Sequence, residues 1–592
     1  MRELLSRPPP SGGAGVEGRR WVGVAGTVVV VLLYVGGAFY VTGGLWGDLS
    51  LRTPAVNPQD HVFFQWVLAH GAQVVAHGAN PFTTTAINVP NGVNLMANTS
   101  ILGLGIPLAP ITLLWGPQTS FALLLIIGLA GTAFGWYWVF SRHLVDNRMV
   151  AFAAGALCGF APGMVSHAQG HVNWTAQFVV PWLVVAVLRI GKGHPVRRGV
   201  WLGLLVTYQA FVNEEVLLYT ALGIGVLLLA YTLINRRAVR HRVLPFLGGV
   251  GTAGLVAAVL LAYPLWVQFF GPQSYHGVPT EVKDVSSDLA AYPAFARLSL
   301  AGSTEGAEGL TQGPAEENSF FGWPLLIICA AAVAVAWRRR VTWALLVTGV
   351  LFAALSLGPH VMIRQKDTGV DGPWRWLAEL PIFNAVVPTR LSLVVVPVAA
   401  ALLALGADTL LRSPTRRPVR IAVVTALLLA ALVPIAPKPI PVADTAPTPP
   451  FVTDQIWRQY VRPGEAVVFV PVSTNIYLDG QLWSARAGLG FPIAGGYFLG
   501  PDDSGAGRAI FNAPTRFTGA LFDQAARSGR VPPVTAETRF KFTDDLRFWR
   551  AGALVLPQTE RNADTLRTLV TRLTGTPPVE AGGAWVWRVQ PG

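Results

Sequence analysis

The chain has 592 residues, of which 52% are hydrophobic and only 13% are charged, whereas a soluble domain has about 25% charged residues. This composition excludes an ordinary soluble enzyme and a disordered chain, because so few charges can solvate a chain of this length only where lipid covers much of its surface. The net charge is +13, but the basic residues lie in short connections between apolar runs, so we expect no nucleic acid among the partners.

Apolar runs that are long enough to cross a bilayer, which takes roughly 17–25 residues, recur along most of the chain. We expect about eleven membrane-spanning helices, near residues 21–43, 118–140, 149–166, 174–190, 199–213, 215–234, 245–269, 319–337, 342–360, 388–411 and 419–436. The run 99–115 is shorter and contains Pro107 and Pro110, so we expect a juxtamembrane or re-entrant helix there. Residues 1–20 are rich in proline and glycine and are expected to form a disordered cytoplasmic leader.

The distribution of lysine and arginine gives the orientation of these spans. With eleven spans, 21 basic residues fall on one side of the membrane, and seven fall on the other side before residue 437. Because basic residues are retained on the cytoplasmic side, we expect a multi-pass protein of the cell membrane with a cytoplasmic N-terminus. The outer loops 44–98, 270–318 and 361–387 and the chain after the last span then lie outside.

The chain after the last span is expected to form a second domain. Residues 437–450 are a proline-rich linker, and residues 451–592 are expected to form an exoplasmic α/β domain. Strands are predicted at 465–472, 552–557 and 585–589, and helices at 451–461 and 560–573. The glycine-rich stretch 488–500 (GLGFPIAGGYFLG) either lines a sugar site by aromatic stacking or forms turns and core of this domain.

The first outer loop contains a helix start with an acidic residue. Asn57 is expected at the N-cap, Pro58 at the first helical position and Asp60 at the third, in a helix that runs to about His77. The positive end of the helix dipole favours an ionised carboxyl at this place, and an ionised carboxylate can act as a general base. Asp60 is therefore either a catalytic base or only a residue that stabilises the helix start.

Two short outer turns carry further polar residues between apolar runs. Glu214 and Glu215 form an acidic pair whose cost at membrane depth indicates a function, unless the turn reaches water and is simply solvated. His167 and His171 are four residues apart, a spacing that suits a metal if the segment is helical, and Asn173 follows them. Hydrogen bonding of these residues to a sugar or a phosphate is an equal alternative.

Basic residues on the outer side are few, so each is a candidate for binding a phosphate. Arg390 lies at the outer end of a span and either binds a phosphate or snorkels to water as an anchor. Arg364, in the loop 361–387, is a weaker alternative. The loop 270–318 is expected to be solvated or to act as a mobile lid, since it contains seven acidic residues. They are Glu281, Asp284, Asp288, Glu305, Glu308, Glu316 and Glu317.

The order of these features resembles the GT-C superfamily of membrane glycosyltransferases, which use polyprenyl-phosphate sugars. One span is followed by an outer loop with the early Asp60, by Pro-Asn-Gly-Val-Asn at 90–94, by a proline-broken helix ending in Leu-Trp-Gly-Pro at 114–117, and by a span ending in Arg142. The resemblance covers roughly residues 20–240 and extends to actinobacterial cell-envelope arabinofuranosyl- and mannosyltransferases. Asp60 is followed by His61 and not by a second acidic residue, which speaks against a metal-bridged scheme.

The resemblance implies transfer of a sugar from a polyprenyl-phosphate donor to a cell-envelope glycan or glycolipid acceptor on the outer face of the membrane. It implies Asp60 as the base. Glu214 and Glu215, which are singled out by the cost of charge at membrane depth, are expected as further catalytic carboxylates, and one of them is alternatively a metal ligand. The expected substrate-binding residues are His61, His167, His171, Asn173, Arg364 and Arg390. A divalent metal such as Mg²⁺ or Mn²⁺ is left open, with no ligand set assigned.

Two other functions stay open at this point. A transporter or flippase for a lipid-linked sugar usually shows repeated halves and helices broken at mid-membrane, and the sequence has no clear internal repeat. A non-catalytic cell-envelope assembly protein would use its C-terminal domain to bind glycan.

Overall fold

The computed structural model describes residues 16–236, 243–283, 285–412 and 416–589. The chain divides into two compact units, each assembled from three segments. Unit 1 comprises Met1–Trp46, Ala122–Leu261 and Val282–Pro441, and unit 2 comprises Gly47–Phe121, Ala262–Glu281 and Val442–Gly592. Most of the expected leader, residues 1–15, lies outside the described residues, and so does Asp284.

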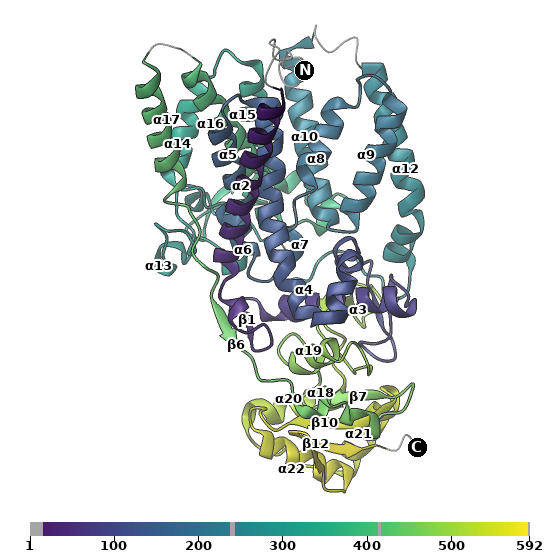
Figure 1. Cartoon of the computed structure of the whole chain (residues 1–592). Helices are drawn as coiled ribbons and strands as arrows, with labels where there is room; N and C mark the ends of the chain where they lie inside the picture. Colours follow the sequence, from purple (N-terminus) through teal and green to yellow (C-terminus); the bar gives the residue numbers. More distant parts are fainter. Residues whose placement is uncertain (1–15, 237–242, 284, 413–415, 590–592) are drawn as a thin grey trace. The chain divides into compact units, whose positions relative to one another are not determined.

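Unit 1 is a bundle of apolar helices that run roughly parallel to one another (Figure 1). Helix α16 is central, since it packs against α5, α14, α15 and α17. The helices are α2 (Val16–Thr42), the later part of α4 (Leu102–Val139), α5 (Arg148–Phe160), α6 (Pro162–His167), α7 (Val172–Thr175), α8 (Val180–Arg189), α9 (Pro195–Ala210), α10 (Glu214–Ile234), most of α12 (Val243–Phe270), α14 (Trp323–Val335), α15 (Arg340–Ser356), α16 (Val395–Leu411) and α17 (Arg417–Leu432).

Within the described residues, seven helical stretches are long and apolar enough to cross a membrane, and α14 and α15 are shorter apolar helices. The seven stretches are Ala25–Thr42, Leu102–Leu144, Arg148–His167, Val172–Arg189, Glu214–Ile234, Val243–Phe270 and Pro388–Leu411. A helix also lies in every one of the eleven expected spans. The multi-span helical fold is therefore confirmed, while the number of spans stays a prediction.

Burial differs strongly among these stretches. Only 17% of the apolar window in α12 is buried inside the protein, against 72% in Pro388–Leu411. Leu244 and Leu255 of α12 are 81% and 65% exposed. Exposed apolar surface along a whole helix is typical of contact with lipid, so α12 has the character of a lipid-facing helix and Pro388–Leu411 that of an interior one.

Helix α4 contains two helical segments that are separated by a break at Gly116. This residue has φ 83° and ψ 163°, a conformation that glycine adopts readily, and Pro117 follows it. The first segment contains Pro107 and Pro110. The run 99–115 thus contains a helix of its own, as expected, and its place relative to the membrane stays a prediction.

Unit 2 combines the first outer loop with the C-terminal residues. Helix α3 (Pro58–His77) packs against α19 (Asp479–Arg486), and residues 61–72 of α3 are all buried. Strand β1 (Arg52–Pro54) pairs antiparallel with β6 (Val442–Asp444). Two further antiparallel pairs are β2 (Thr83–Thr84) with β3 (Val93–Asn94) and β8 (Leu499–Pro501) with β9 (Ala509–Phe511). Sequence patterns did not indicate that the first outer loop shares a compact unit with the C-terminal residues.

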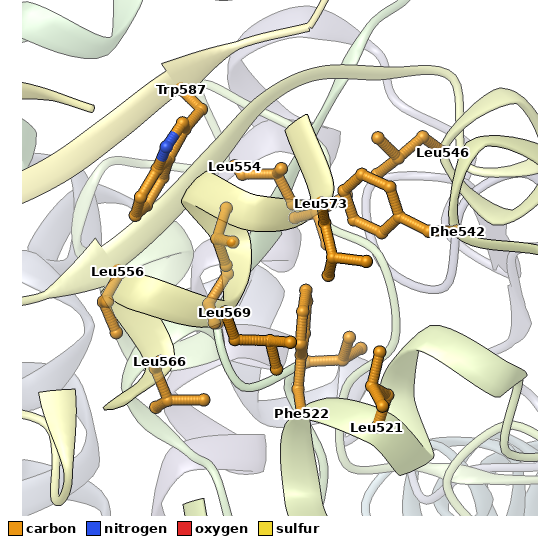
Figure 2. Packing of buried hydrophobic residues seen from close by; sticks show 14 of the residues in the cluster. Leu521, Phe522, Phe542, Leu546, Leu554, Leu556, Leu566, Leu569, Leu573 and Trp587 are labelled. Atoms are coloured by element: carbon orange, nitrogen blue, oxygen red, sulfur yellow. The ribbon is translucent and has the colours of Figure 1, made fainter. Parts of the chain in front are cut away.

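The C-terminal residues contain a four-stranded sheet in the order β11–β12–β10–β7. Strand β7 (Ala466–Phe469) is parallel to β10 (Ala551–Pro557), whereas β12 (Ala584–Arg588) is antiparallel to both β10 and β11 (Val579–Ala581). Leucine and phenylalanine side chains of the helices α20 (Phe517–Ser528), α21 (Ala536–Phe548) and α22 (Ala563–Thr574) pack on the strands (Figure 2). The expected α/β fold and its three predicted strands are confirmed.

The helices of this α/β region differ in part from the prediction. The expected helix 451–461 is replaced by α18 (Pro450–Thr453) and the 3-10 turn η9 (Ile456–Gln459), because Gln455 between them has φ 56° and interrupts the helix. Helices α19, α20 and α21 are absent from the predicted elements. Helix α22 lies where a helix is expected, at 560–573.

Candidate functional site

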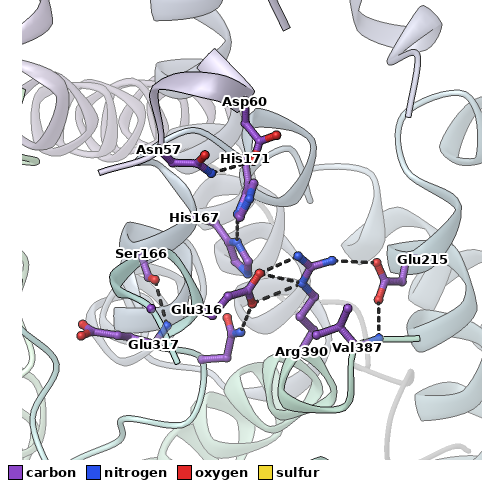
Figure 3. A network of polar contacts seen from close by, with 12 residues as sticks. Asn57, Asp60, Ser166, His167, His171, Glu215, Glu316, Glu317, Val387 and Arg390 are labelled. Atoms are coloured by element: carbon purple, nitrogen blue, oxygen red, sulfur yellow. Dashed lines mark hydrogen bonds and ion pairs between the residues drawn. The ribbon is translucent and has the colours of Figure 1, made fainter. Parts of the chain in front are cut away.

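Arg390 is the centre of a polar cluster in unit 1. It lies in η8 (Pro388–Val394), a 3-10 helix that precedes α16, and its side chain is 16% exposed. Its guanidinium donates to Oε1 of Glu316 from Nε at 3.0 Å and from Nη2 at 2.5 Å, and to Oε2 of Glu215 from Nη1 at 3.1 Å (Figure 3). We call Arg390, Glu215, Glu316, His167 and His171 the Arg390 cluster.

Glu215 is held at the first turn of α10. Asn213 caps this helix, because its Oδ1 accepts a hydrogen bond from the backbone N–H of Val216 at 3.1 Å. The positive end of the helix dipole stabilises a carboxylate here. Oε1 of Glu215 accepts from the Tyr219 hydroxyl at 2.6 Å and from the backbone N–H of Val387 at 3.3 Å. Glu215 therefore joins the start of α10 to the segment that carries Arg390.

Glu316 ends η5 (Pro314–Glu316), at the close of the loop 270–318. Asn318 donates to its Oε2 at 2.8 Å, and the neighbouring Glu317 is fixed by an ion pair with Arg297 at 2.7 Å. Burial raises the pKa of Glu316, but the nearby Arg390 and His167 outweigh burial and lower this pKa to about 2. Glu316 is thus ionised at neutral pH, and it is one of two carboxylates around Arg390.

His167 and His171 lie beside Glu316. Their Nδ1 atoms are 2.9 Å apart, so one ring donates a hydrogen bond to the other. One ligand atom from each of His167, His171 and Glu316 lies within 4.8 Å of the other two. His167 is fully buried. Because imidazole nitrogens and carboxylate oxygens are common metal ligands, the three side chains fit a divalent metal ion that would bind there.

An apolar cavity in unit 1 adjoins the Arg390 cluster. It is lined mainly by residues of α4, α8, α10, α15 and α16 and has a volume of about 150 Å³. Trp174 and Tyr219 belong to both features, since they line the cavity while the Trp174 ring lies 4.9 Å from the Arg390 guanidinium and Tyr219 donates to Glu215. The lining extends to His143, just beyond the end of α4. The Arg390 cluster is therefore the charged end of this region, and the cavity is its apolar end.

Asp60 lies in unit 2, in the first turn of α3. The helix begins at Pro58 with Asn57 at the N-cap and ends at His77, as predicted. The Asn57 side chain makes no capping bond, and its Nδ2 instead donates to Oδ2 of Asp60 at 2.6 Å (Figure 3). The hydroxyl of Tyr497 donates to Oδ1 at 2.9 Å. A neutral donor on each oxygen fixes the orientation of this carboxylate.

His61, next to Asp60, is buried in the core of unit 2. Its Nδ1 lies 2.7 Å from Oγ1 of Thr53, and its Nε2 lies 2.9 Å from the side-chain nitrogen of Gln65. Burial, and to a lesser extent the charge of Arg486, lowers the pKa of His61 to about 3. Both ring nitrogens are engaged within the protein, and the contact of His61 with substrate stays a prediction.

Three other predicted residues lie in unit 1. Asn173, in α7, is buried, and its carbonyl accepts from the side chain of Asn213 at 3.4 Å. Glu214 is the half-buried residue before Glu215. Arg364 is exposed at the turn between β4 (His360–Ile363) and β5 (Lys366–Asp371) and is not among the residues that bond to the Arg390 cluster.

Glu316 is the functional candidate that sequence reasoning missed, because it is only one of seven acidic residues in the loop 270–318. A signal was nevertheless present. Glu316 and Glu317 stand directly before the apolar run 319–337, as Glu214 and Glu215 stand at the start of the run 215–234. An acidic pair at the entry to a span is costly in both places.

No family model matches the sequence, and no curated protein matches it. The fold does match solved structures. The arabinofuranosyltransferase AftD from mycobacteria aligns over 98% of this chain with a TM-score of 0.52 and 14% identity, and a mutant of that enzyme aligns with a TM-score of 0.51 and 14% identity. An oligosaccharyltransferase from Archaeoglobus fulgidus aligns over 92% of this chain and 71% of its own, with 11% identity and a TM-score of 0.45.

The mycobacterial enzyme gives the fold assignment, because its TM-score lies above 0.5 over nearly the whole of this chain. This chain spans 40% of the length of the AftD chain and 42% of that of its mutant. The resemblance expected from the sequence is thereby confirmed at the level of fold, and the chain has the fold of the GT-C membrane glycosyltransferases.

Proposed function

We propose that this protein is a membrane glycosyltransferase that takes its sugar from a polyprenyl-phosphate donor. One observation supports this most: Trp174 and Tyr219 belong both to the Arg390 cluster's surroundings and to the apolar cavity. A polyprenyl-phosphate sugar has the same two parts, a charged phosphate next to the sugar and a long apolar chain. In this proposal the cluster binds the phosphate and the cavity holds the chain.

Arg390 is the proposed phosphate ligand. Its planar guanidinium presents several N–H donors in a fixed fork, which matches the oxygens of a phosphate as well as those of a carboxylate. Glu215 has a further hydrogen bond from Tyr219 and holds one edge of the fork. We therefore assign Glu215 to positioning Arg390, and Glu214 stays a proposed second carboxylate of the site.

His167, His171 and Glu316 are the proposed ligands of a divalent metal. Imidazole ligands suit Zn²⁺, whereas oxygen ligands suit Mn²⁺ and Mg²⁺, and Mg²⁺ keeps several waters. Since two of the three ligands are imidazoles, we propose zinc, with manganese as the second choice because the carboxylate suits it. A bound cation supplies positive charge that stabilises a leaving phosphate. The protein's own part is to hold the two imidazoles and the carboxylate together and to exclude water from the buried His167.

Asp60 is the proposed general base, which takes the proton of the acceptor hydroxyl as the sugar is transferred. An ionised carboxylate suits this role, and the hydrogen bonds from Asn57 and Tyr497 hold the Asp60 carboxylate in one orientation. The proposed acceptor is a cell-envelope glycan or glycolipid at the outer face of the cell membrane, with the N-terminus of the protein in the cytoplasm.

A transfer assay tests this proposal. The purified full chain is reconstituted in liposomes and supplied with polyprenyl-phosphate sugars that carry a radiolabel in the sugar, together with glycan and glycolipid acceptors. We expect one molecule of polyprenyl phosphate to be released for each sugar transferred. Movement of the labelled donor across the liposome membrane without any transfer would contradict the proposal and indicate a flippase.

A further inference from the structure

The glycine-rich stretch 488–500 lies against the first outer loop inside unit 2. The backbone N–H of Asn88 donates to the carbonyl of Gly495 at 3.0 Å, and the N–H of Val89 donates to the carbonyl of Ile493 at 3.2 Å. The N–H of Ile493 donates in turn to the carbonyl of Ala86 at 3.1 Å. These bonds align the stretch with the loop, and Tyr497 follows directly after them.

Two glycines permit this close approach. Gly495 and Gly496 have φ values of 70° and 134°, which residues with a side chain rarely adopt. A Cβ on Gly496 would lie 2.4 Å from Cδ1 of Ile87, and a Cβ on Gly495 would lie 2.6 Å from the carbonyl oxygen of Ser473. Gly496 therefore serves contact with the first outer loop, whereas Gly495 serves close packing against Ser473.

The position of Tyr497 is fixed on several sides. Its backbone N–H donates to Oε1 of Gln481 at 2.7 Å, and Nε2 of the fully buried Gln481 donates to its carbonyl at 3.2 Å. Its ring stacks on Phe511 with centroids 5.8 Å apart and meets the ring of Phe63 edge-on at 6.1 Å. The hydroxyl then donates to Oδ1 of Asp60 at 2.9 Å. Groups that are held this firmly orient a partner at little further cost in entropy.

We infer that Tyr497 is a positioning residue for Asp60, so that the C-terminal α/β region supplies part of the machinery of the base. The inference rests on the proposed role of Asp60 in transfer. Tyr497 donates to one carboxylate oxygen while Asn57 donates to the other. The hydrogen bond from Tyr497 favours the ionised carboxylate over the protonated one and helps to set the orientation of the carboxylate plane.

Replacing Tyr497 by phenylalanine tests the inference. Tyr497→Phe keeps the ring contacts and removes only the hydroxyl, so the protein should fold normally. We expect the acid limb of the pH profile of kcat/KM to move upward by about one pH unit, because a hydrogen bond to a charged group stabilises it by an amount of this order. Activity at pH values well above the limb should fall several-fold at most.

Tyr477→Phe is the matched control. The Tyr477 hydroxyl donates to a carboxylate as well, to Oδ1 of Asp523 at 2.8 Å, within the same α/β region. This variant loses a bond of the same kind, so a purely structural effect appears equally in both proteins. We expect the pH profile of Tyr477→Phe to match that of the unchanged chain.

A second variant displaces Tyr497 without removing its hydroxyl. Gly496→Ala introduces a methyl group that clashes with Ile87, so it should shift the acid limb in the same direction as Tyr497→Phe. An unchanged profile for both variants in folded protein would overturn the inference.

A double-mutant cycle separates this inference from the proposed function. Thermal unfolding of Tyr497→Phe, Asp60→Asn and the double variant measures whether the two side chains interact, whatever the activity. Non-additive unfolding with full activity in Asp60→Asn would reject Asp60 as the base and leave the contact in place. Loss of activity in Asp60→Asn with additive unfolding and an unmoved pH profile in Tyr497→Phe would reject Tyr497 alone.

Discussion

The Arg390 cluster in unit 1 and the surroundings of Asp60 in unit 2 hold a charged side chain by different means. Arg390 is surrounded by two carboxylates, those of Glu215 and Glu316. Asp60 is held by two neutral donors, the amide of Asn57 and the hydroxyl of Tyr497. Opposite charges interact strongly where water is scarce, whereas neutral hydrogen bonds contribute less energy and mainly fix direction. The difference fits the proposed roles, in which Arg390 stabilises charge and Asp60 is the oriented reactive group.

The largest loss of transfer activity is expected when Asp60 is replaced. Asp60→Asn keeps the size of the side chain and removes the base, so transfer should fall roughly 100-fold or more, as is usual when acid–base catalysis is lost. The measurement is the initial rate of sugar transfer by protein that elutes as a folded species. Asp48→Asn, in the same outer loop but hydrogen-bonded to Ser50, is the control and should keep its activity. Near-normal transfer by Asp60→Asn would show that Asp60 is not the catalytic base.

A metal titration sharpens the role of unit 1 as the source of charge stabilisation. His171→Ala removes one of three proposed ligands, so the affinity for Zn²⁺ or Mn²⁺ should fall at least about 10-fold, since even partners outside the ligand shell contribute that much. Isothermal titration of the metal-free protein measures the affinity directly, without an activity assay. His194→Ala changes an exposed histidine of the loop between α8 and α9 and should bind metal normally. If His171→Ala and His194→Ala bind the metal with equal affinity, His171 is not a metal ligand, and Arg390 is the cation that stabilises the phosphate.

Arg390→Lys tests whether the geometry of the charge matters as well as its sign. Lysine keeps the charge but lacks the planar fork, so the apparent KM for the donor should rise about 10-fold, a loss of about 1.4 kcal/mol. The KM for the acceptor should change little. Arg364→Lys, on the exposed β4–β5 hairpin, is the matched control. If Arg390→Lys has the donor KM of the unchanged chain, Arg390 is an anchor at the membrane interface and not a phosphate ligand.

The smallest change in donor KM is expected when a residue that lines the apolar cavity is replaced. Thr220→Phe adds bulk to the lining, so the KM for a long-chain polyprenyl donor should rise about 5-fold, as moderate overpacking costs on the order of 1 kcal/mol. A donor with a short, soluble chain should be unaffected. Leu233→Phe adds an aromatic ring to the same helix at a position that is 55% exposed, and it should not discriminate between the donors. A rise that is equal for both donors would exclude the cavity as the chain site.

Sequence patterns predict unit 1 better than unit 2 for a physical reason. A run of about twenty apolar residues can form few stable structures other than a membrane helix, so such helices are readily predicted. A charged residue at the end of such a run is easily recognised as a candidate, as for Arg390 and Glu215. The start of the Arg390 span as a 3-10 helix is not readable, because it depends on packing against α15. The helix start at Asn57 is readable because proline and an early carboxylate have local preferences.

The partners of these residues are not predictable in the same way. Glu316 lies 74 positions from Arg390, and the acidic pair before the run 319–337 does not show which of its two carboxylates binds Arg390. Tyr497 lies in a stretch without any charge, which fits turns and core as well as it fits a site. Contacts of this kind are set by tertiary packing and not by local pattern, so the prediction of Asp60 as a candidate came without the residue that orients it.

The bond between Tyr497 and Asp60 joins residues that are 437 positions apart. A growing chain lengthens by roughly 5–20 residues per second, so about 20–90 s pass between the synthesis of the two residues. For most of this time α3 has no α19 to pack against, and β1 has no β6 to pair with. A chain released before residue 497 can contain every residue of the Arg390 cluster and still lack the partner of its base. The orientation of Asp60 by Tyr497 is thus available only after the chain has been synthesised beyond residue 497.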